Sequence, residues 1–404
     1  MYQYHTLPNG IRIIFRQTES AVAYSAVYVN VGSRDEAGQL EGMAHFIEHS
    51  LFKGTTHRRA SHILNRIDGV GGELNAFTTK EETCIYASSL SQHLDRCLEL
   101  FADILFHSTF PEAEIEKERE VVIEEIDSYR DSPADLIYDE YEELAFQGHP
   151  LAHNILGTKR NVRHFTPDMI RQHLQSNYTT SRMAISVVGN TTMERLVRMC
   201  EKYFGGYSSQ APQRAAQPPA FRQFDITRQR RTHQSHIIVG CEAPNLYDTA
   251  KTAFTLLCNI LGGPAMNSRL NVAVRERHGF CYNIESQYTL FSDTGLLCIY
   301  AGVDRDARER ALQLIRRELQ RLVDTPLTAS QLRAAQLQLI GQMAISNDNA
   351  LNEMQSIGKA CLVYGTVDPL ADTNRHIMAV TQHDIQSLAA RYLAPGKIST
   401  LCYV

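Results

Sequence analysis

The sequence predicts an α+β fold with two homologous sheet-plus-helices domains in tandem. In each half, short apolar runs typical of strands are followed by longer segments with helical periodicity. A chain of 404 residues is also too long for one ordinary core. Between the halves, residues 205–219 lack periodicity and are rich in Ser, Gln and Pro. We therefore expect a first domain over 1–207, a linker over 208–221 and a second domain over 222–404.

Local signals give the elements of the first half. Asn9-Gly10 lies between two apolar segments and predicts a hairpin with a two-residue turn. Thr166-Pro167-Asp168 supplies a cap and a first-turn proline for a helix. The remaining patterns predict strands over 21–32, 73–78, 83–88 and 183–189, and helices over 61–70, 90–105, 111–130, 136–146 and 166–176.

The second half repeats this order in a degenerate form. Tyr86-Ala87-Ser88 and Tyr300-Ala301-Gly302 each lead into a helix, and Thr166 and Thr381 each begin a late helix before a final strand. Such repetition indicates a duplicated α+β unit. The chemistry is not duplicated, because the second half has no H-x-x-E-H sequence and carries Gln342 about where the first half has Glu125.

The segment 42–54 concentrates the polar residues that suggest chemistry. As a helix it is apolar on most sides, yet His45 and His49 are four residues apart and share a face with Glu48. Such groups are costly on an apolar helix unless something satisfies them, and Zn²⁺ prefers neutral imidazole ligands. The order H-x-x-E-H is the inverted zincin motif, in which Glu48 would take a proton from the attacking water. The alternative is a pair of core histidines that happen to be four residues apart.

A catalytic zinc site usually needs a third protein ligand, and the predicted helix over 111–130 offers one. Its apolar residues form one buried stripe, and Glu118 and Glu125, two turns apart, lie on or beside it. Most other glutamates of this segment belong to a solvated acidic face. Spacing alone does not choose between Glu124 and Glu125 as the ligand.

Composition limits the class of protein. The formal net charge of −5 and the dispersed basic residues give no indication of binding to nucleic acid or to a membrane surface. Nine cysteines stand singly in apolar contexts, as expected for reduced core thiols in a cytoplasmic protein. No signal peptide and no apolar run long enough to span a membrane is visible in the sequence.

His45-Phe46-Ile47-Glu48-His49, followed by Phe52-Lys53-Gly54-Thr55, resembles the pitrilysin and mitochondrial-processing-peptidase family of zinc peptidases. In that family the ligand glutamate lies about 75 residues beyond the second histidine and seven after another glutamate, in a helix of this kind. The resemblance therefore implies that one Zn²⁺ per chain is bound by His45, His49 and Glu125, with Glu118 orienting a ligand.

Two further segments resemble parts of the same family. The segment 72–78 is similar to its substrate-binding edge strand, which implies that Asn75 and Ala76 lie beside the scissile bond of a peptide added to that edge. The segment 275–282 resembles the motif in which an arginine and a tyrosine seven residues apart bind substrate and stabilise the oxyanion, which implies these roles for Arg275 and Tyr282.

The resemblance implies a zinc-dependent endopeptidase that hydrolyses peptides or short unfolded polypeptides in a closed chamber. Relatives of about twice this length form a clamshell, so this chain would supply one half. We therefore expect a homodimer, or a heterodimer with a related subunit, in which Arg275 and Tyr282 act at the partner's zinc site. The alternative function is a non-catalytic or regulatory assembly subunit of the same fold.

Overall fold

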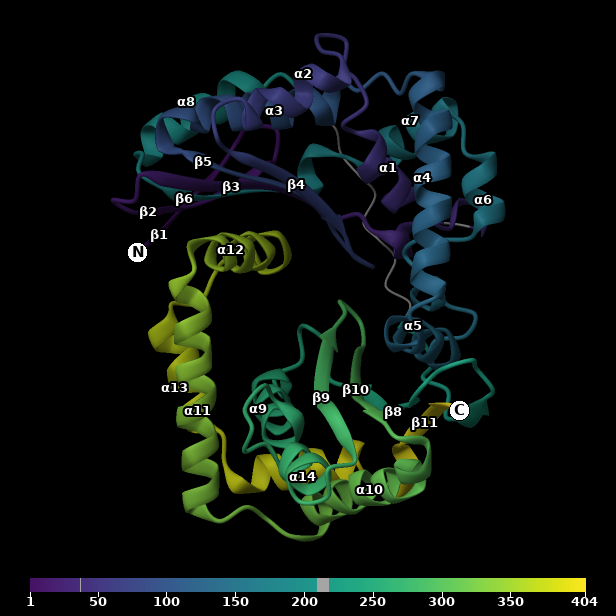
Figure 1. Ribbon diagram of the computed structural model, residues 1–404. Coiled ribbons are helices and arrows are strands. Elements are labelled where there is room, and N and C mark those ends of the chain that lie inside the picture. Colours follow the sequence, from purple (N-terminus) through teal and green to yellow (C-terminus); the bar gives the residue numbers. More distant parts are fainter. Residues whose placement is uncertain (37, 209–217) are drawn as a thin grey trace. The chain divides into compact units, whose positions relative to one another are not determined.

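Residues 1–36, 38–208 and 218–404 are described by a computed structural model, which divides into two units (Figure 1). The first unit comprises Met1–Asp127, His153–Arg214 and Ile345–Pro369, and the second comprises Ser128–Ala152, Ala215–Ala344 and Leu370–Val404. Each unit contains one sheet covered by helices, which confirms the predicted α+β class. Residues 209–217 of the predicted linker lie outside the described residues.

The first unit is built on a six-stranded sheet in the order β1-β2-β6-β3-β5-β4, in which only β2 and β6 run parallel. Its strands are β1 (Tyr2–Thr6), β2 (Arg12–Gln17), β3 (Val22–Val29), β4 (Glu73–Thr78), β5 (Thr83–Leu90) and β6 (Met183–Gly189). The predicted hairpin β1–β2 is present, but the two-residue turn was wrong. The strands pair as far as Thr6 and Arg12, and the Leu7 amide donates to the Ile11 carbonyl at 2.9 Å, so three residues, 8–10, form the turn.

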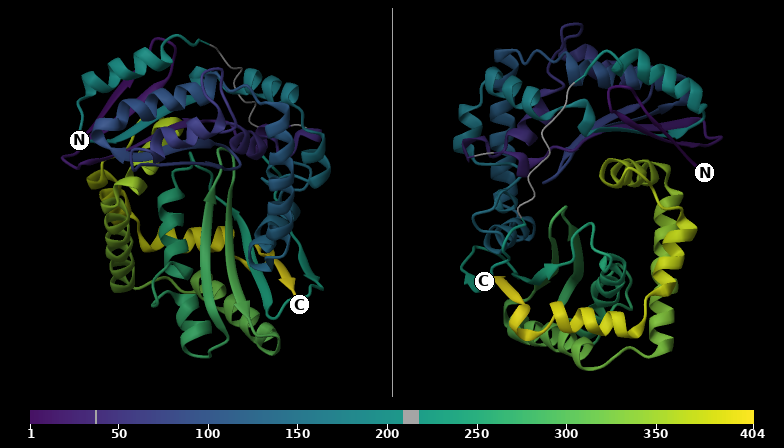
Figure 2. Two further views of the ribbon diagram at one scale, coloured as in Figure 1. Left: turned by 45° about the horizontal axis from the view of Figure 1, so that its top comes forward. Right: turned by 180° about the vertical axis from the view of Figure 1, so that it is seen from behind.

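Helices cover both faces of this sheet, and alternate side chains of β2 point into two different cores, one on each face. Ile13 and Phe15 point into one core, whereas Ile14 points into the other. The first core contains residues of the helices α1 (Met43–Ser50), α2 (Ala60–Asp68), α3 (Leu94–Phe106), α4 (Glu112–Arg130), α6 (Lys159–His164), α7 (Pro167–Asn177) and α8 (Met193–Phe204). The opposite face is covered by α12 (Ala350–Tyr364), as the further views show (Figure 2).

The second unit has a five-stranded sheet in the order β7-β11-β8-β10-β9. The strands are β7 (Asp225–Arg228), β8 (Ser235–Ala243), β9 (Cys281–Leu290), β10 (Gly295–Val303) and β11 (Ser399–Tyr403). One face packs on α9 (Lys251–Gly262), α10 (Arg308–Asp324), α11 (Ala329–Asp348), α13 (Leu370–Ala379) and α14 (Gln382–Tyr392). The helix α5 (Pro133–Ala145) packs on the other face through Ile137 and Tyr141.

Several local predictions are confirmed. Thr166 caps α7, since its hydroxyl accepts a hydrogen bond from the Met169 amide at 3.3 Å. All nine cysteines are buried and unpaired with one another. Among the described residues, no helix is both long and apolar enough to cross a bilayer.

Candidate metal centre

The helix α1 is held in the core by its apolar residues, and its first turn is fixed by a buried carboxylate. Met43, Phe46 and Ile47 are fully buried. The carboxylate of Glu36 accepts hydrogen bonds from the amides of Gly42 and Ala44 at 2.8 and 2.7 Å, which satisfies two of the free N–H groups at the helix start. Gly42 has a φ of 94°, and a Cβ there would lie 2.7 Å from a backbone oxygen. These contacts fix the position of α1 and therefore of its polar face.

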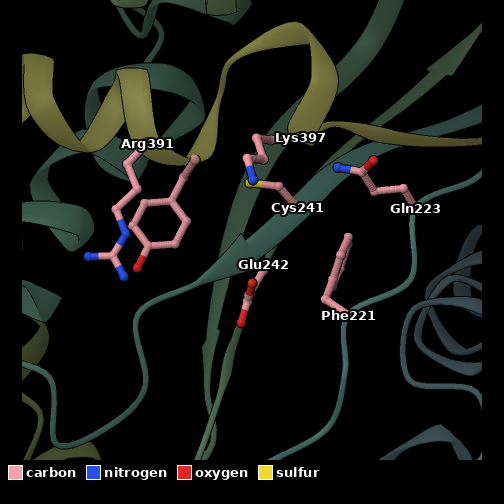
Figure 3. Close-up of a pocket in the computed structure, with 7 residues that line it drawn as sticks. Phe221, Gln223, Cys241, Glu242, Arg391 and Lys397 are labelled. Carbon is pink, nitrogen blue, oxygen red and sulfur yellow. The ribbon is translucent and has the colours of Figure 1, made fainter.

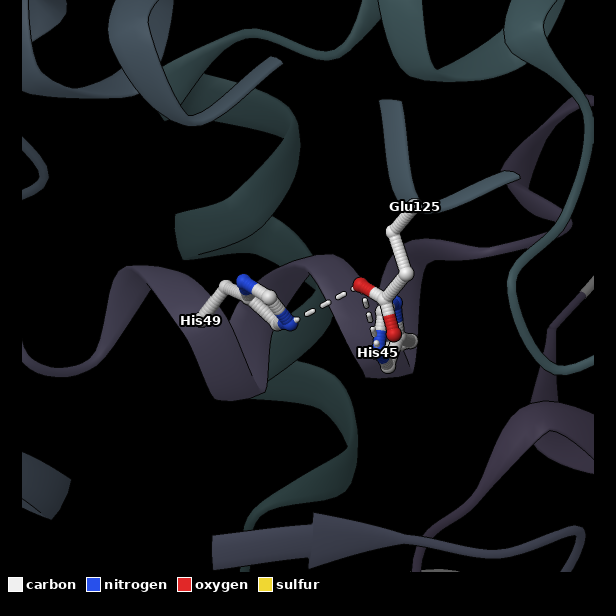
Figure 4. A group of neighbouring side chains, drawn as sticks. All are labelled: His45, His49 and Glu125. Atoms are coloured by element: carbon white, nitrogen blue, oxygen red, sulfur yellow. Dashed lines mark ion pairs between the residues drawn. The ribbon is translucent and has the colours of Figure 1, made fainter. Parts of the chain in front are cut away.

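On that face, His45 and His49 lie one helical turn apart with ring centroids 4.6 Å from each other. Glu125 of α4 completes the group (Figure 4). Its Oε2 atom is 3.7 Å from Nε2 of His45 and 3.4 Å from Nε2 of His49. The neighbouring Glu124 is exposed, so the structure brings Glu125 and not Glu124 to the two imidazoles.

These distances can be compared with the needs of a zinc ion. A tetrahedral Zn²⁺ with ligands at about 2.0–2.2 Å holds its donor atoms roughly 3.4 Å apart. The separations of 3.4 and 3.7 Å agree with this value. The donor set, two imidazoles and a carboxylate, is also one that catalytic zinc uses. The residues present therefore fit a zinc ion.

The surroundings shift the pKa values of the two histidines in opposite directions. Burial, with a contribution from His49, lowers the pKa of His45 to about 3, so this imidazole is neutral as a metal ligand must be. Burial opposes protonation of His49 as well, but its hydrogen bond to Glu118 and the charge of Glu125 outweigh burial and raise its pKa. A Zn²⁺ ion would take the place of that proton.

Glu118 lies behind His49 on α4. Its Oε1 atom is 2.8 Å from Nδ1 of His49, and its Oε2 atom is 2.5 Å from Nζ of Lys53. Burial alone would raise the pKa of Glu118, but the bonds to His49 and Lys53 hold that pKa below its usual value. Glu118 is therefore an anion that accepts from Nδ1–H of His49 and leaves Nε2 free to bind a metal.

Glu48 is held on the same side of α1. The hydroxyl of Thr78 donates to its Oε2 atom at 2.6 Å, and burial raises its pKa above the ordinary value for glutamate. Thr78 is the last residue of β4, and β4 lies at the edge of its sheet as the sequence predicts. Asn75 and Ala76 lie on the same strand, the first exposed and the second partly buried.

Arg275 and Tyr282 belong to the second unit, whereas the other predicted site residues belong to the first. Arg275 lies in the π-helical turn Asn271–Glu276, and Tyr282 is the second residue of β9. The Arg275 guanidinium is 5.7 Å from the centroid of the Tyr282 ring, and Tyr282 is 84% exposed. A phenol and a guanidinium therefore lie side by side at the surface of the second unit.

Sequence reasoning did not assign Glu36, Lys53 or Thr78 to the site. Lys53 belongs to the segment that carries the family resemblance and follows His49 by four residues, and this spacing is a local signal that could have been used. Glu36 and Thr78 reach α1 only through the folding of distant segments.

The second unit carries a separate cavity of about 490 Å³ (Figure 3). Its lining mixes two cations with one carboxylate and two aromatic rings: Arg391, Lys397, Glu242, Phe221 and Tyr392, with Gln223 and Cys241. Among the described residues of its lining, Glu242 is the only acid and no imidazole is present, so these residues lack the donor set of the histidine centre.

Comparison with known proteins agrees with the motifs. Residues 12–159 match the family described as insulinase (peptidase family M16), and residues 164–339 match the peptidase M16 inactive domain. The chain is 33% identical over 390 residues to the Bacillus subtilis (strain 168) protein named "Uncharacterized zinc protease YmxG", covering 96% of this chain and 95% of that one. It is 34% identical over 394 residues to "Uncharacterized zinc protease SCO5738" of Streptomyces coelicolor, with coverage of 95% and 85%.

Solved structures show the same fold. A protease from Helicobacter pylori superposes with a TM-score of 0.92 at 21% identity, over 100% of this chain and 99% of that one. A Pseudomonas fluorescens structure titled as a peptidase M16 inactive domain gives 0.91 at 19% identity, over 100% and 98%. The chain belongs to the insulinase family, peptidase family M16, which confirms the resemblance drawn from the motifs.

Proposed function

We propose that this chain is a zinc-dependent endopeptidase that hydrolyses peptides or short unfolded polypeptides in a closed chamber. The observation that carries the proposal is the meeting of His45, His49 and Glu125 at zinc-ligand distances, with Glu48 beside them. The zinc-protease names of its relatives support it.

The residues have distinct roles in this proposal. When bound, Zn²⁺ would polarise the peptide carbonyl and lower the pKa of the attacking water. Glu48 accepts the proton of that water and returns it to the leaving amine. Burial raises the pKa of Glu48 towards neutral pH, which suits a residue that must both accept and return a proton. The Thr78 hydroxyl donates to Oε2 of Glu48 and so holds the carboxylate in place while the other oxygen takes the proton.

The substrate would bind as an added strand at β4. One side of β4 pairs with β5, and as an edge strand it offers the backbone groups of its other side. An extended peptide can pair with these groups next to Asn75 and Ala76, three and two residues before Thr78. Because such pairing involves backbone atoms, it selects extended peptides more than particular sequences.

The proposal includes a dimer in which Arg275 and Tyr282 of one copy act at the zinc site of the other. The 84% exposure of Tyr282 supports this, because its hydroxyl is free to approach a second molecule. It would donate a hydrogen bond to the oxyanion that forms during hydrolysis.

The substitution Glu48→Gln tests the catalytic role. We expect the variant to bind zinc normally, because Glu48 is not among the three ligands, and to lose at least about 100-fold in kcat, as expected for removal of a general base. Zinc content and turnover of a peptide library measure the two effects. Glu124→Gln, at an exposed position of α4, is the matched control and should change neither.

Unchanged turnover in Glu48→Gln would exclude this residue as the base. A wild-type chain that holds zinc but cleaves no peptide of the library would contradict the proposed activity and support the non-catalytic subunit instead.

A further inference from the structure

A second group of metal-ligand side chains lies in the first unit, and none of its members belongs to the HxxEH motif. His57 is in the segment between α1 and α2, and Asp103 and His107 are at the C-terminal end of α3. Donor atoms of these three residues lie within 4.8 Å of one another. In the described part of the chain, this is one of two such groups, the other being His45, His49 and Glu125.

The three side chains converge on one point. Nδ1 of His57 is 2.6 Å from Oδ1 of Asp103, and Nδ1 of His107 is 3.2 Å from the same oxygen. The two imidazole rings meet edge to face, with centroids 4.6 Å apart. Both imidazoles therefore aim the same type of nitrogen at a single carboxylate oxygen.

Two of the three groups are held from behind. Oδ2 of Asp103 accepts from the Thr55 hydroxyl at 2.9 Å and from Arg58 Nη1 at 2.6 Å, so Oδ1 is left for the histidines. Nε2 of His107 is 2.6 Å from the hydroxyl of Tyr207. Outer partners of this kind orient the ligands of metal sites.

Asp103 also has the charge that a ligand needs. Its side chain is only 3% exposed. Burial alone would raise its pKa, but the hydrogen bonds from His57, Arg58 and Thr55 hold that pKa below the usual value. Asp103 is therefore an anion at neutral pH.

We propose that His57, Asp103 and His107 form a second binding site for a divalent transition metal such as Zn²⁺. The ligand atoms are Nδ1 of each histidine and Oδ1 of Asp103, with water filling the remaining position. Two imidazoles and one carboxylate are a donor set that Zn²⁺ accepts. The side chain of His57 is 57% exposed, which leaves the metal a path from solvent.

Binding requires one small movement and a change of protonation. Zinc holds its donors roughly 3.4 Å apart, so His57 must withdraw by several tenths of an ångström from Asp103. His57 lies outside the helices and its side chain is 57% exposed, so rotation of the imidazole displaces no core residue. The metal takes the place of the Nδ1 protons, and His107 then carries its proton on Nε2 and donates to the oxygen of Tyr207. Metal affinity at this site therefore falls as pH falls.

The surrounding charges make this site weaker than the centre on α1. Arg58 pairs with both Asp103 and Glu99, and Arg66 pairs with Glu99. The two arginines therefore already neutralise the two carboxylates in the absence of a metal ion. Around His45 and His49, by contrast, three carboxylates face the one ammonium of Lys53: Glu48, Glu118 and Glu125. Excess negative charge favours a divalent cation there.

The experiment is a titration of the untagged full-length chain with Zn²⁺ in competition with a coloured chelator. We expect one tightly bound and one more weakly bound zinc per chain. His57→Ala and His107→Ala should each lose the weaker zinc and keep the tight one, whereas His45→Ala should lose the tight zinc and keep the weaker one. His62→Ala, an exposed histidine of α2, is the matched control and should keep both.

A second measurement guards against misfolded variants. Added Zn²⁺ should raise the thermal unfolding midpoint of His45→Ala, and this rise should be absent when His57→Ala is combined with it, because a ligand of the folded state stabilises it. A wild-type chain that binds only the tight zinc, or a His57→Ala variant that still binds two, overturns the second site. A wild-type chain that binds the weaker zinc but not the tight one would instead contradict the proposed function.

Discussion

At the scale of single residues, Lys53 makes an ion pair with Glu118 that the zinc motif alone does not predict. It lies 2.5 Å from Oε2 of Glu118, whose other oxygen holds Nδ1 of His49. Glu118 is only 5% exposed, and a buried carboxylate that loses its cation is costly. We therefore regard Lys53 as a positioning residue that keeps Glu118 charged and His49 oriented.

The substitution Lys53→Met keeps the length of the side chain and removes its charge. Without the ammonium, the pKa of Glu118 rises and its hold on His49 weakens, so zinc affinity should fall about 10–100-fold, as outer-partner substitutions usually cause. Competition with a chelator, repeated over a range of pH, measures this loss, and Lys53→Arg should recover part of it.

Lys117→Met is the matched control. Lys117 pairs with Glu114 at 2.7 Å on the exposed side of α4, and its side chain is 69% exposed. Surface pairs of this kind contribute little, so zinc affinity should not change. An equal loss in both variants would mean that Lys53 acts only through general charge.

How much of the site the sequence predicts depends on how local each contact is. His45, Glu48 and His49 share one helix turn, so periodicity alone places them together. Choosing Glu125 over Glu124 needed the family resemblance, because the two lie on adjacent positions of α4. Thr78 reaches Glu48 across 30 residues of chain, and no pattern in the sequence links the two.

At the scale of secondary-structure elements, α12 covers a sheet face that the sequence pattern does not assign to it. The strand β6 is buried at all of its positions, and such continuous burial requires cover on both faces of the sheet. The strand's apolar run therefore indicates a second layer. It does not indicate that the layer comes from residues 350–364, far along the chain, where Met354 and Ile357 pack on that face.

The contact of α12 with the sheet makes Gly358 sensitive to substitution. A Cβ at this position would lie 2.4 Å from Cε2 of Tyr28 and 2.9 Å from Cβ of Ser186. Gly358→Ala should therefore destabilise the first unit by about 1–3 kcal/mol, as overpacking of a core does. A lower thermal unfolding midpoint would show this.

Gly341→Ala in α11 is the control for helix propensity. Nothing lies within 4 Å of the Cβ that it would add. Alanine is favoured over glycine in a helix interior by roughly 0.5–1 kcal/mol, so this variant should be unchanged or more stable. If Gly358→Ala raised the midpoint as Gly341→Ala does, the close packing of α12 on β3 and β6 would be wrong.

At the scale of the whole molecule, each unit includes a segment from the other half of the sequence, which the tandem repeat did not predict. Residues 128–152 belong to the second unit, and residues 345–369 belong to the first. The apolar stripe of α5 predicts that this helix is buried, but a stripe does not identify the sheet on which it packs. Ile137 and Tyr141 of α5 pack on the sheet of the second unit. The order of the predicted helices along the chain therefore indicates that there are two units, but it does not indicate which helix belongs to which unit.

The proposed dimer can be tested by mixing two inactive chains. Glu48→Gln removes the base but keeps Tyr282, and Tyr282→Phe keeps the base but removes the phenol hydroxyl. In a mixed dimer, the zinc site of the Tyr282→Phe chain would receive Tyr282 from the other chain and would be complete. Random exchange of equal amounts makes half of the dimers mixed, with one complete site in each, so about a quarter of wild-type activity should return.

Each variant assayed alone at the same total concentration is the control. Tyr282→Phe alone should lose about 100-fold or more in kcat, as removal of an oxyanion donor does. The recovered activity should also fall on dilution, because it depends on association of the chains. Activity no greater than the mean of the two separate variants, under conditions where exchange is demonstrated by mass, would mean that Tyr282 does not act at the site of a second copy.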